Sequence, residues 1–501
     1  MRDHSPITIE NFNGLFDRGG ADSVPLDHWS DCNNVQVIEG GFETRPGINT
    51  LVVSEDASIP DVLQVYTYRK LESESLLVLD INGNIFDTGS PTPLTPILTI
   101  PTMIDFGFTI IDGRAYISPT ADKNHGMINE FVYVYKGDGI TARKAAGQPP
   151  KDADGIMTAS AGSTGNVEAG VHIFGVVYET DTGFDTQIGP DTLATITASG
   201  TTTVDLSSIP VSPNSYVTKR RIVATRAIDP TLYTGNTRGY QFFFVPDGEI
   251  DDNLSTSKTV NFFDIELLED ASNLLDLFSE IPAGVGLGQY RNRMLVWALQ
   301  PDNEHAVVLV SNANEPEAFD QVTGLIQLQG NNNSITICQQ LRDVLYIFNP
   351  IQTFGTQDNG DVPATWSIVA LDQGYGASLH GIATCLDVSG TNADFLIICN
   401  YSGIFLFTGT FSFPEFSFKV ANLWAQTNFN DFTNIEIYND TVLKRIYIIM
   451  PNQQIILVGD YQHGLDAQNV RWMKWTFIDQ ITSITLWRID QLVIAAKKIE
   501  S

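Results

Sequence analysis

A pair of apolar, β-branched segments around a short turn recurs along this chain. The later copies begin at Asp343, Asp394, Lys444 and Thr482. Their spacing is about fifty residues and then roughly forty, which matches the length of one four-stranded propeller blade. Each blade of a propeller covers the apolar face of its neighbour, so such copies are stable only as an array. The recurrence therefore predicts an all-β chain folded as a β-propeller.

Two earlier hairpins carry the same design. Leu76–Gly89 centres on Asn82-Gly83, and Phe108–Ser118 centres on Asp112-Gly113. Both dipeptides are typical of type I′ turns, in which the two central residues have positive φ. We therefore expect Gly83 and Gly113 to occupy positive-φ turn positions. Large side chains that follow the later hairpins are expected to fill the gaps between blades: Trp366, Trp424, Trp472 and Trp475.

The middle of the chain has a different composition. From Ala146 to Gly200 it is rich in Gly, Thr, Ala and Asp, and short strand-like segments separated by turns continue to Phe263. This pattern is typical of a small β-sandwich inserted in a loop between blade strands. We therefore divide the chain into an N-terminal arm with the first blades (1–150), the inserted sandwich (151–265) and the remaining blades (266–501). Asp264–Phe278 has apolar residues near helical spacing but is short and acidic, and it is predicted to form either one short helix or a linker turn.

The charge balance limits the kinds of partner. The chain has 28 Lys and Arg against 59 Asp and Glu, a formal charge of −31 and a pI near 4.3. Such a surface repels nucleic-acid backbones, which argues against sequence-specific DNA binding. An acidic wall that DNA passes without adhering remains compatible with it. Simple solubility is the competing explanation.

Cysteine usage and hydropathy point to a soluble product of a reducing cytoplasm. Cys32, Cys338, Cys385 and Cys399 show no CxxC spacing, and we expect them to be reduced and mostly buried. No apolar run approaches the roughly 18 residues of a membrane span. The N-terminal residues have no apolar core of a secretion signal.

No catalytic or metal-binding motif is evident. The seven histidines lack metal-ligand spacing, so neither a metal nor another cofactor is expected: His4, His28, His125, His172, His305, His380 and His463. Paired carboxylates of a glycosidase could come from separate blades, with five candidates: Asp343, Asp361, Asp372, Asp387 and Asp394. With 59 acids such pairs also arise by chance, and we predict that the protein is not an enzyme.

Lys219–Arg221 with Arg226 forms the one basic cluster. Strand alternation points Lys219 and Arg221 to one side and Arg220 to the other. These residues are therefore expected to pair with local acids on the sandwich, and an intersubunit salt bridge is the alternative.

The N-terminal region resembles that of the tail nozzle and tail-tube-capping propeller proteins of short-tailed phages. The resemblance lies in Asn11–Ile48, where the matching residues are Gly19, Gly20, Pro25, Asn33, Asn34, Gly41, Arg45, Pro46 and Gly47. Read locally, Arg45-Pro46-Gly47 forms a corner that leads from the arm into the first blade, with Arg45 paired to a nearby acid.

Two later blades and the insert resemble the same family. One blade matches at Arg293, Met294, Leu295, Ser311, Pro316 and Phe319, and another lies at Gly374–Gly409. The insert is similar to the fibronectin-III/immunoglobulin-like β-sandwiches of virion proteins. Arg45, Pro46, Gly47, Gly83, Gly113 and Arg293 are therefore the positions expected to matter for structure.

The resemblance implies a structural virion protein, made in the host bacterial cytoplasm. It would form a homohexameric ring at the distal end of the tail channel and act in DNA retention and ejection. Its expected partners are adaptor or portal-complex proteins, tail fibre or spike proteins, and genomic DNA that passes without specific binding. The alternative is a glycan-binding or glycan-hydrolysing propeller for host recognition, with Trp424, Trp472 and Trp475 as candidate sugar platforms.

Overall fold

The computed structural model describes most of the chain. The described residues are 15–16, 28–29, 33–38, 41–45, 59, 61–70, 73–90, 94–121, 126–299, 305–328, 333–385, 395–412, 415–426, 435–450, 454–487 and 491–497.

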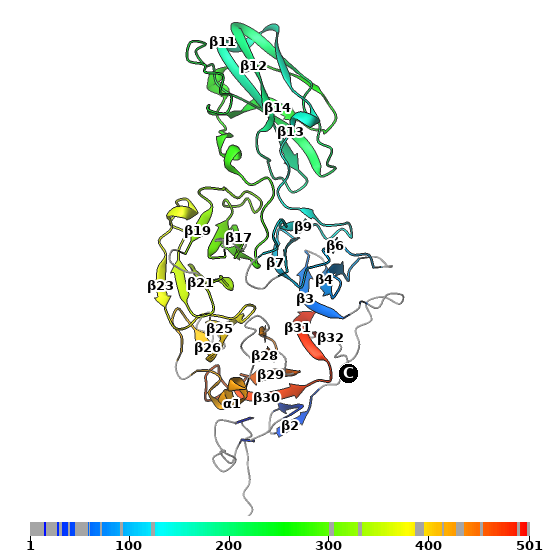
Figure 1. The fold of residues 1–501 in the computed structure, drawn as a ribbon, viewed down its shortest axis with the longest axis vertical. Coiled ribbons are helices and arrows are strands. Elements are labelled where there is room, and N and C mark those ends of the chain that lie inside the picture. Colours follow the sequence, from blue (N-terminus) through cyan, green and yellow to red (C-terminus); the bar gives the residue numbers. More distant parts are fainter. Residues whose placement is uncertain are drawn as a thin grey trace, which may run out of the picture.

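In the part of the chain that the structure describes, seven antiparallel sheets surround a common axis, in the lower part of the molecule in Figure 1. The first blade consists of β3 (Val62–Arg69), β4 (Glu74–Asp80), β5 (Asn84–Asp87) and β6 (Leu98–Thr99). The second consists of β7 (Asp105–Ile111), β8 (Arg114–Thr120), β9 (Tyr133–Tyr135) and β10 (Arg143–Lys144). The third consists of β16 (Gly286–Tyr290), β17 (Arg293–Trp297), β18 (Val307–Val310) and β19 (Leu325–Gln327).

The remaining sheets complete the ring. The fourth blade consists of β20 (Ile337–Leu341), β21 (Val344–Phe348), β22 (Thr353–Thr356) and β23 (Val369–Asp372), and the fifth of β24 (Ile382–Cys385), β25 (Phe395–Asn400) and β26 (Gly403–Phe407). The sixth consists of β27 (Glu436–Asp440), β28 (Arg445–Met450), β29 (Ile455–Asp460) and β30 (Arg471–Thr476). The seventh consists of β31 (Gln480–Trp487) and β32 (Gln491–Lys497) in the described residues. The protein is thus a β-propeller, as its hairpin recurrence predicts.

The blades are held together by apolar side chains packed between neighbouring sheets. Every residue of β28 is buried, and its isoleucines pack with Trp472 and Trp475 of the same blade and with Ile397 of the fifth. All four tryptophans expected between blades are buried, with exposed fractions of 5% or less. Burying one such side chain stabilises the fold by about 1.5–3 kcal/mol, so the gaps between blades are its main source of stability.

The two early hairpins turn differently. Asp112 and Gly113 both have positive φ, 51° and 74°, and connect Ile111 directly to Arg114, as a type I′ turn requires. The turn at Gly83 has φ of 77° at the glycine alone, so the type I′ assignment of Asn82-Gly83 is wrong. Here Asp80 Oδ1 accepts the backbone N–H groups of Asn82 and Asn84, which stabilises a longer loop with one left-handed residue.

The ring closes where the end of the chain meets its beginning. The Thr67 hydroxyl of β3 lies 2.8 Å from the Thr485 hydroxyl of β31. The backbone N–H of Val65 donates to the Ser483 hydroxyl over 3.2 Å. Ala495 of β32 packs with Val65 and further apolar residues of the first blade. The seventh sheet is therefore fastened to the first by side chains.

The N-terminal arm lies along the outer edge of the sixth blade. Asn33 forms a parallel bridge with Lys474 of β30, and the hairpin of β1 (Val35–Ile38) and β2 (Gly41–Thr44) follows. Arg45 donates to Asn34 Oδ1 over 3.0 Å and lies over the Phe477 ring, 4.8 Å from its centroid. The expectation that Arg45 pairs with an acid is thus wrong for the described residues, because an amide and an aromatic face take that place. Pro46 and Gly47 lie outside the described residues.

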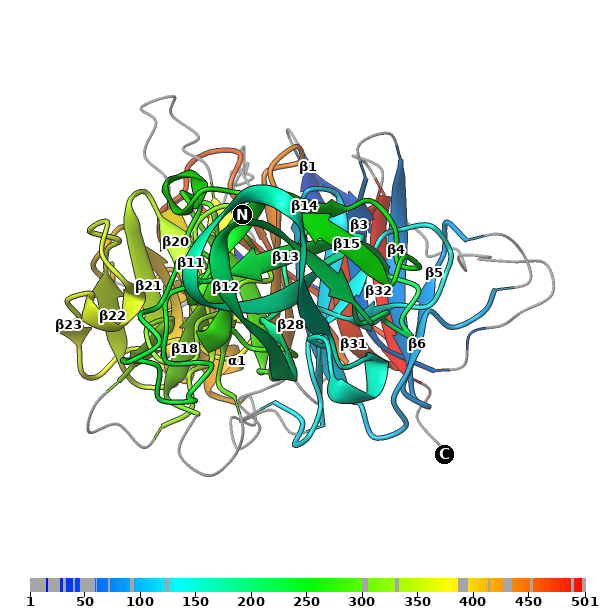
Figure 2. The same cartoon turned by 90° about the horizontal axis from the view of Figure 1, so that it is seen from above.

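A separate five-stranded sheet forms the insert, the upper body in Figure 1. Its order is β14 (Phe243–Ile250), β13 (Val217–Ala224), β11 (Thr158–Thr180), β12 (Gly189–Ser207) and β15 (Ser257–Val260). β11 pairs with β12 along most of its length and with β13 at its end, with several register shifts. Such irregularities let long strands bend, and the bent sheet, seen from above in Figure 2, encloses a core of its own. The two layers of the inserted β-domain therefore come from one continuous sheet.

The insert leaves and re-enters the propeller at adjacent points between the second and third blades. Ala146 and Glu280 form an antiparallel bridge, as do Phe131 and Pro282. Of the two structures expected over Asp264–Phe278, a short helix or a linker turn, the turn is present. It consists of two short 3₁₀ segments, Asp264–Glu266 and Ser272–Asp276. Phe243 and Phe244 pair with Asp270 and Glu269 through their backbones, so tertiary pairing overrides the weak helical periodicity.

Candidate functional site

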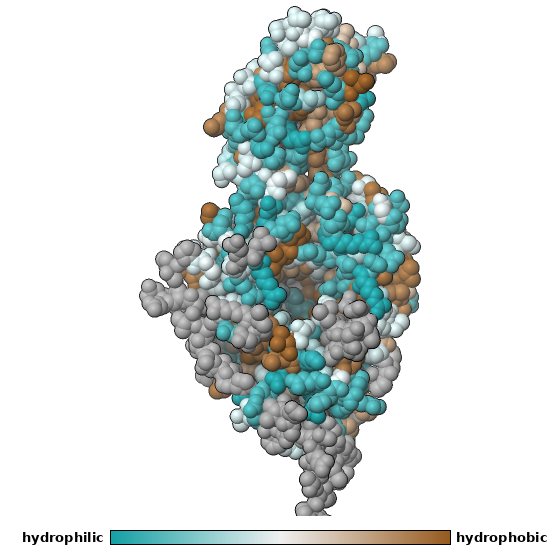
Figure 3. Space-filling model, turned by 180° about the vertical axis from the view of Figure 1, so that it is seen from behind, coloured by the Kyte–Doolittle hydropathy of each residue, from teal (hydrophilic) through white to brown (hydrophobic). Residues whose placement is uncertain are grey.

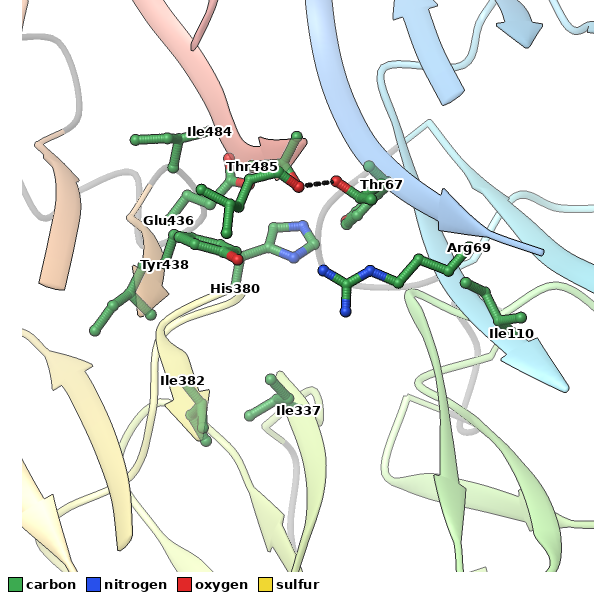
Figure 4. Close-up of a pocket in the computed structure, with 13 residues that line it drawn as sticks. Thr67, Arg69, Ile110, Ile337, His380, Ile382, Glu436, Tyr438, Ile484 and Thr485 are labelled. Atoms are coloured by element: carbon green, nitrogen blue, oxygen red, sulfur yellow. Dashed lines mark hydrogen bonds between the residues drawn. The ribbon is translucent and has the colours of Figure 1, made fainter. Parts of the chain in front are cut away.

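The strands nearest the propeller axis surround a cavity of about 470 Å³. We call it the axial cavity. Figure 3 shows this face of the propeller hollowed near its centre. Its walls come from the first strands of six of the seven sheets, and Figure 4 shows their side chains. The lining combines polar groups, chiefly Arg69, His380, Glu436 and Tyr438, with isoleucine side chains.

His380 and Asp105 connect two blades that are not neighbours in the ring. His380 Nε2 lies 2.7 Å from Asp105 Oδ2. His380 precedes β24 of the fifth blade, whereas Asp105 begins β7 of the second. The pair therefore spans the axis. His380 has φ of 53°, a left-handed conformation stabilised in part by its carbonyl, which accepts the N–H of Ile437.

Glu436, the first residue of β27, joins three consecutive sheets. Its Oε1 accepts hydrogen bonds from the Ser483 hydroxyl of β31 at 2.9 Å and from the Gln64 amide of β3 at 3.4 Å. Burial raises the pKa of the Glu436 carboxyl to about 7, against the opposing effects of His380 and Ser483. Near neutral pH this carboxyl therefore exchanges a proton readily inside the cavity.

Arg69 at the end of β3 supplies a cation at the cavity wall. Its Nε donates to Glu74 Oε1 over 2.8 Å. The outer edge of the guanidinium, which carries the other two nitrogens, points toward His380, as Figure 4 shows. The side chain is 63% exposed. The phenol of Tyr438 lies close enough for the Arg69 charge to favour its ionised form, although burial dominates and raises the pKa of Tyr438.

The arrangement is suited to holding a small polar molecule. It offers a guanidinium, an imidazole, a carboxyl of raised pKa and hydroxyl groups over apolar walls, a mixture typical of small-molecule sites. Among the described residues, no group of three or more His, Cys, Asp or Glu side chains is placed to hold a metal ion.

None of the glycosidase candidates that the structure describes, Asp343, Asp361 and Asp372, lines the axial cavity. Asp343 is exposed in the turn between β20 and β21, Asp361 is exposed between β22 and β23, and Asp372 ends β23. Asp387 and Asp394 lie outside the described residues. The tryptophans proposed as sugar platforms are buried and present no face to solvent.

Arg293 connects neighbouring blades. Its Nε donates to Asp358 Oδ2 over 3.1 Å, and Nη1 donates to the Ser311 carbonyl over 2.8 Å. Asp358 follows β22 of the fourth blade, so the ion pair crosses from the third blade to the fourth. The structural importance expected of Arg293 stays a prediction.

The basic cluster divides between the two faces of β13, as strand alternation predicts. Arg220 is fully buried and donates to the Pro210 and Ser255 carbonyls. Lys219 pairs with Glu249, and Arg221 with Asp185 and Glu269. Arg220 also pairs with Asp252, so the expected pairing with local acids is confirmed for Lys219–Arg221. It is wrong for Arg226, which donates to the Leu267 carbonyl and lies over the Phe243 ring.

Two further expectations concern thiols and membranes. Cys338 and Cys399 are free and buried, as expected. Cys32 and the environment of Cys385 lie outside what the structure describes. Within the described part of the chain, no helix has the length and apolar character needed to cross a bilayer.

The sequence pattern gave no indication of Asp105, and His380 appears in it only as one scattered histidine. Asp105 is 275 residues from His380, and Gln64 is 372 from Glu436. Their one common feature is that Asp105 and Glu436 each stand at the first position of an inner strand. That alignment becomes visible only when all blades are assigned.

Comparison with known proteins gives little beyond the fold. No family model matches the chain, no curated protein matches it, and no enzyme family is found. Solved structures that resemble it include the computationally designed Ika8 protein, with a TM-score of 0.33 and 9% identity over 88% of this chain and 95% of that one.

Two natural proteins give similar values. Hsv2 of Kluyveromyces lactis has a TM-score of 0.26 and 10% identity over 83% of this chain and 96% of that one. The WD40 domain of Toxoplasma gondii coronin has 0.23 and 9%, over 68% and 80%. At such identities a likeness concerns the fold alone.

Proposed function

We propose that this chain is a non-enzymatic structural subunit of a phage tail, which assembles as a ring around the distal end of the DNA channel. The observation that carries the proposal is the rigid joint between insert and propeller. A subunit of a closed ring must hold its contact surfaces in a fixed orientation so that each copy meets its neighbours in the same way. An insert on a flexible tether would not hold that orientation. The resemblance of Asn11–Ile48 to tail nozzle proteins supplies the class of assembly.

The joint is built around Arg143 of β10. Its Nη2 donates to Asp181 Oδ1 of the insert at 2.7 Å, and its guanidinium lies over the Tyr216 ring, 4.7 Å from the centroid. Nη1 lies 3.7 Å from Glu317 Oε2 of the third blade. One cation therefore ties together the second blade, the insert and the third blade.

Glu317 is buried at this joint and fully bonded. Its Oε2 accepts the N–H of Ala146 at 2.6 Å, and its Oε1 accepts the Tyr116 hydroxyl at 3.1 Å. Apolar residues of the insert, including Phe184 and Phe242, extend the same core into both blades. A buried, hydrogen-bonded charge pair backed by apolar packing resists hinge motion, which supports a fixed orientation of the insert.

The size of the axial cavity limits where DNA could pass. A volume of 470 Å³ holds about sixteen water molecules, and the His380–Asp105 pair spans it. A DNA duplex does not fit there. In the proposed assembly the channel lies between subunits, and the propeller axis serves another purpose.

The charge of the chain suits a channel wall. Each copy carries a formal charge of −31, and a ring multiplies it around one lumen. Phosphates are repelled by such a surface at distances up to the Debye length, about 8 Å at physiological salt. DNA would therefore pass without adhering, which agrees with retention and release of a genome rather than with its recognition.

Electron microscopy of intact particles tests this proposal. A short epitope inserted at Gly235, an exposed turn of the insert with φ of 84° and open space around it, marks the subunit without disturbing its core. Antibody label should appear as a ring at the distal end of the tail. The matched control is the untagged particle.

Absence of the chain from purified particles would contradict the proposal. So would label on single, unassembled copies along a fibre. Because isolated tail proteins can stay monomeric until a template is present, the oligomeric state of the purified chain is not used as the criterion.

A further inference from the structure

We propose that the axial cavity binds a small organic carboxylate, held between Arg69 and His380 with its apolar chain against isoleucine side chains. This inference does not depend on the assembly proposed above, since every contributing residue belongs to one copy. It starts from the position of two basic groups that face each other across open space.

The guanidinium of Arg69 points into the cavity toward the His380 ring, as Figure 4 shows. Glu74 occupies only its Nε, and no other described residue accepts a bond from its outer nitrogens. Two parallel N–H groups at that edge match the two oxygens of a carboxylate. An anion placed there completes the guanidinium's hydrogen bonding.

His380 adds the second contact. Its Nε2 is held at 2.7 Å from Asp105 Oδ2, which fixes the plane of the ring. The imidazole and the Arg69 guanidinium lie on opposite sides of a gap in the axial cavity, as Figure 4 shows. A carboxylate in that gap would have the guanidinium on one side and the imidazole on the other.

Carboxyl groups around the cavity decide how large the ligand's charge can be. Asp105 is bound to His380, Glu74 is bound to Arg69, and burial raises the pKa of Glu436 to about 7. Tyr66 and Tyr438 also face the cavity, and burial holds their pKa values above the usual range. Because three carboxyl groups, Asp105, Glu74 and Glu436, lie at or beside the cavity, each further negative charge on a ligand adds repulsion. A monocarboxylate is therefore favoured over a phosphate or a dicarboxylate.

The cavity walls accommodate an apolar chain. Ile337 and Ile382 lie on one side of the gap between Arg69 and His380, and Ile110 lies beside Arg69. All three are partly exposed, although they occupy inner strands. Covering them removes apolar surface from water, at about 25 cal/mol per Å². A ligand with one charged end and a short hydrocarbon chain satisfies both parts of the cavity.

Isothermal titration calorimetry on the full chain tests the assignment with acetate, butyrate and hexanoate as probes. We expect saturable binding at one site per chain. Affinity should rise by about fourfold for each added methylene until the chain meets the far wall. n-Butylamine and n-butanol keep the hydrocarbon but lack the anion, and they should bind about tenfold more weakly or not at all.

Two variants locate the site. Arg69→Gln removes the guanidinium from an exposed side chain and should weaken butyrate binding about tenfold or more. His380→Asn should do the same while tolerating the left-handed backbone. Lys219→Gln is the matched control, because Lys219 pairs with Glu249 on the insert as Arg69 pairs with Glu74. It should bind like the unmodified chain.

Three results would overturn the proposal: no carboxylate binding by the unmodified chain, equal binding of butylamine, or binding unaffected by Arg69→Gln. The last criterion holds even if His380→Asn fails to fold, since Arg69 is on the surface. None of these results bears on whether the chain forms a ring in a particle, so the two proposals can fail separately.

Discussion

The Ser483 hydroxyl donates to Glu436 Oε1 over 2.9 Å, and the same hydroxyl oxygen accepts the backbone N–H of Val65. One side chain of the seventh sheet thus bonds to the sixth blade and to the first. Because propeller stability depends on closing the ring, the protonation state of Glu436 acts at the point where closure is made.

Stability should fall as pH rises from 5 to 8 through the contribution of Glu436. The carboxyl has a pKa of about 7 in the folded chain and about 4.3 when unfolded. Between these values the folded state holds more protons, so the free energy of unfolding decreases with rising pH, by up to about 3 kcal/mol from this group. Scanning calorimetry of the unmodified chain and of Glu436→Gln separates it from other groups.

The difference in melting temperature between Glu436→Gln and the unmodified chain, followed from pH 5 to pH 8, measures the contribution of Glu436. Gln cannot ionise, so the variant should gain relative to the unmodified chain as pH rises above 5. A difference that stays constant from pH 5 to pH 8 would show that Glu436 is not titrating in this range.

Arg143→Met should destabilise the joint between insert and propeller by about 3 kcal/mol or more, because the Glu317 carboxylate loses its buried cationic partner. Burial raises the pKa of Glu317, so its protonation should make this cost smaller at pH 5 than at pH 8. Thermal melts at both pH values measure it.

The double variant Arg143→Met with Glu317→Gln supplies the control. It should cost less than the sum of the single variants, since no unpaired charge remains. Strict additivity would argue against a coupled ion pair at the joint.

Gly83→Ala should destabilise more than Gly113→Ala. Both glycines have positive φ, which costs other residues about 1–2 kcal/mol. At Gly83 an added Cβ would also lie 1.9 Å from the Ile100 carbonyl oxygen, whereas at Gly113 no atom lies within 4 Å. Melting temperatures of the two variants give the comparison. Equal losses would mean that backbone conformation alone matters at these turns.

Asn34→Gly should loosen the N-terminal arm without straining its backbone, since Asn34 has φ of 54°. The side chain accepts the N–H of Thr476 at 2.9 Å and donates to its hydroxyl at 2.9 Å. Losing these bonds costs about 2 kcal/mol, which should speed amide hydrogen exchange in residues 33–45 by about tenfold or more.

Asn33→Ala is the matched control for the arm. Asn33 is exposed and bridges Lys474 through its backbone, so exchange should change little. An arm that exchanges equally fast in both variants would show that the Asn34 side chain does not hold it.

Local patterns predicted local structure well. Asp112-Gly113 has the type I′ geometry that its residues favour, and Lys219 and Arg220 point to opposite faces of their strand. Both outcomes depend on residues within a few positions of one another. The type I′ prediction for Asn82-Gly83 is wrong because the Asp80 carboxylate accepts two backbone N–H groups and stabilises a longer loop. That interaction involves a residue outside the dipeptide itself.

The axial site could not have been predicted in this way. Arg69, Asp105, His380 and Glu436 come from four different sheets, and nothing near each residue distinguishes it from other polar residues. Arg45 shows the same limit on a smaller scale, because its partner ring, Phe477, lies at the other end of the chain. Sites of this kind arise from closure of the ring, and only the assembled fold places their members together.

The contact between Thr67 and Thr485 has a consequence for synthesis in the cell. The two residues are 418 positions apart, so the first blade is made long before its closing partner. At 5–20 residues per second, β3 leaves the ribosome roughly 20–80 seconds before β31 exists. During that interval an apolar sheet face and an uncovered inner strand are exposed to other chains, which is the condition for aggregation. The yield of folded protein should therefore depend on how well the cell protects nascent chains from aggregation, even though these surfaces are covered in the folded molecule.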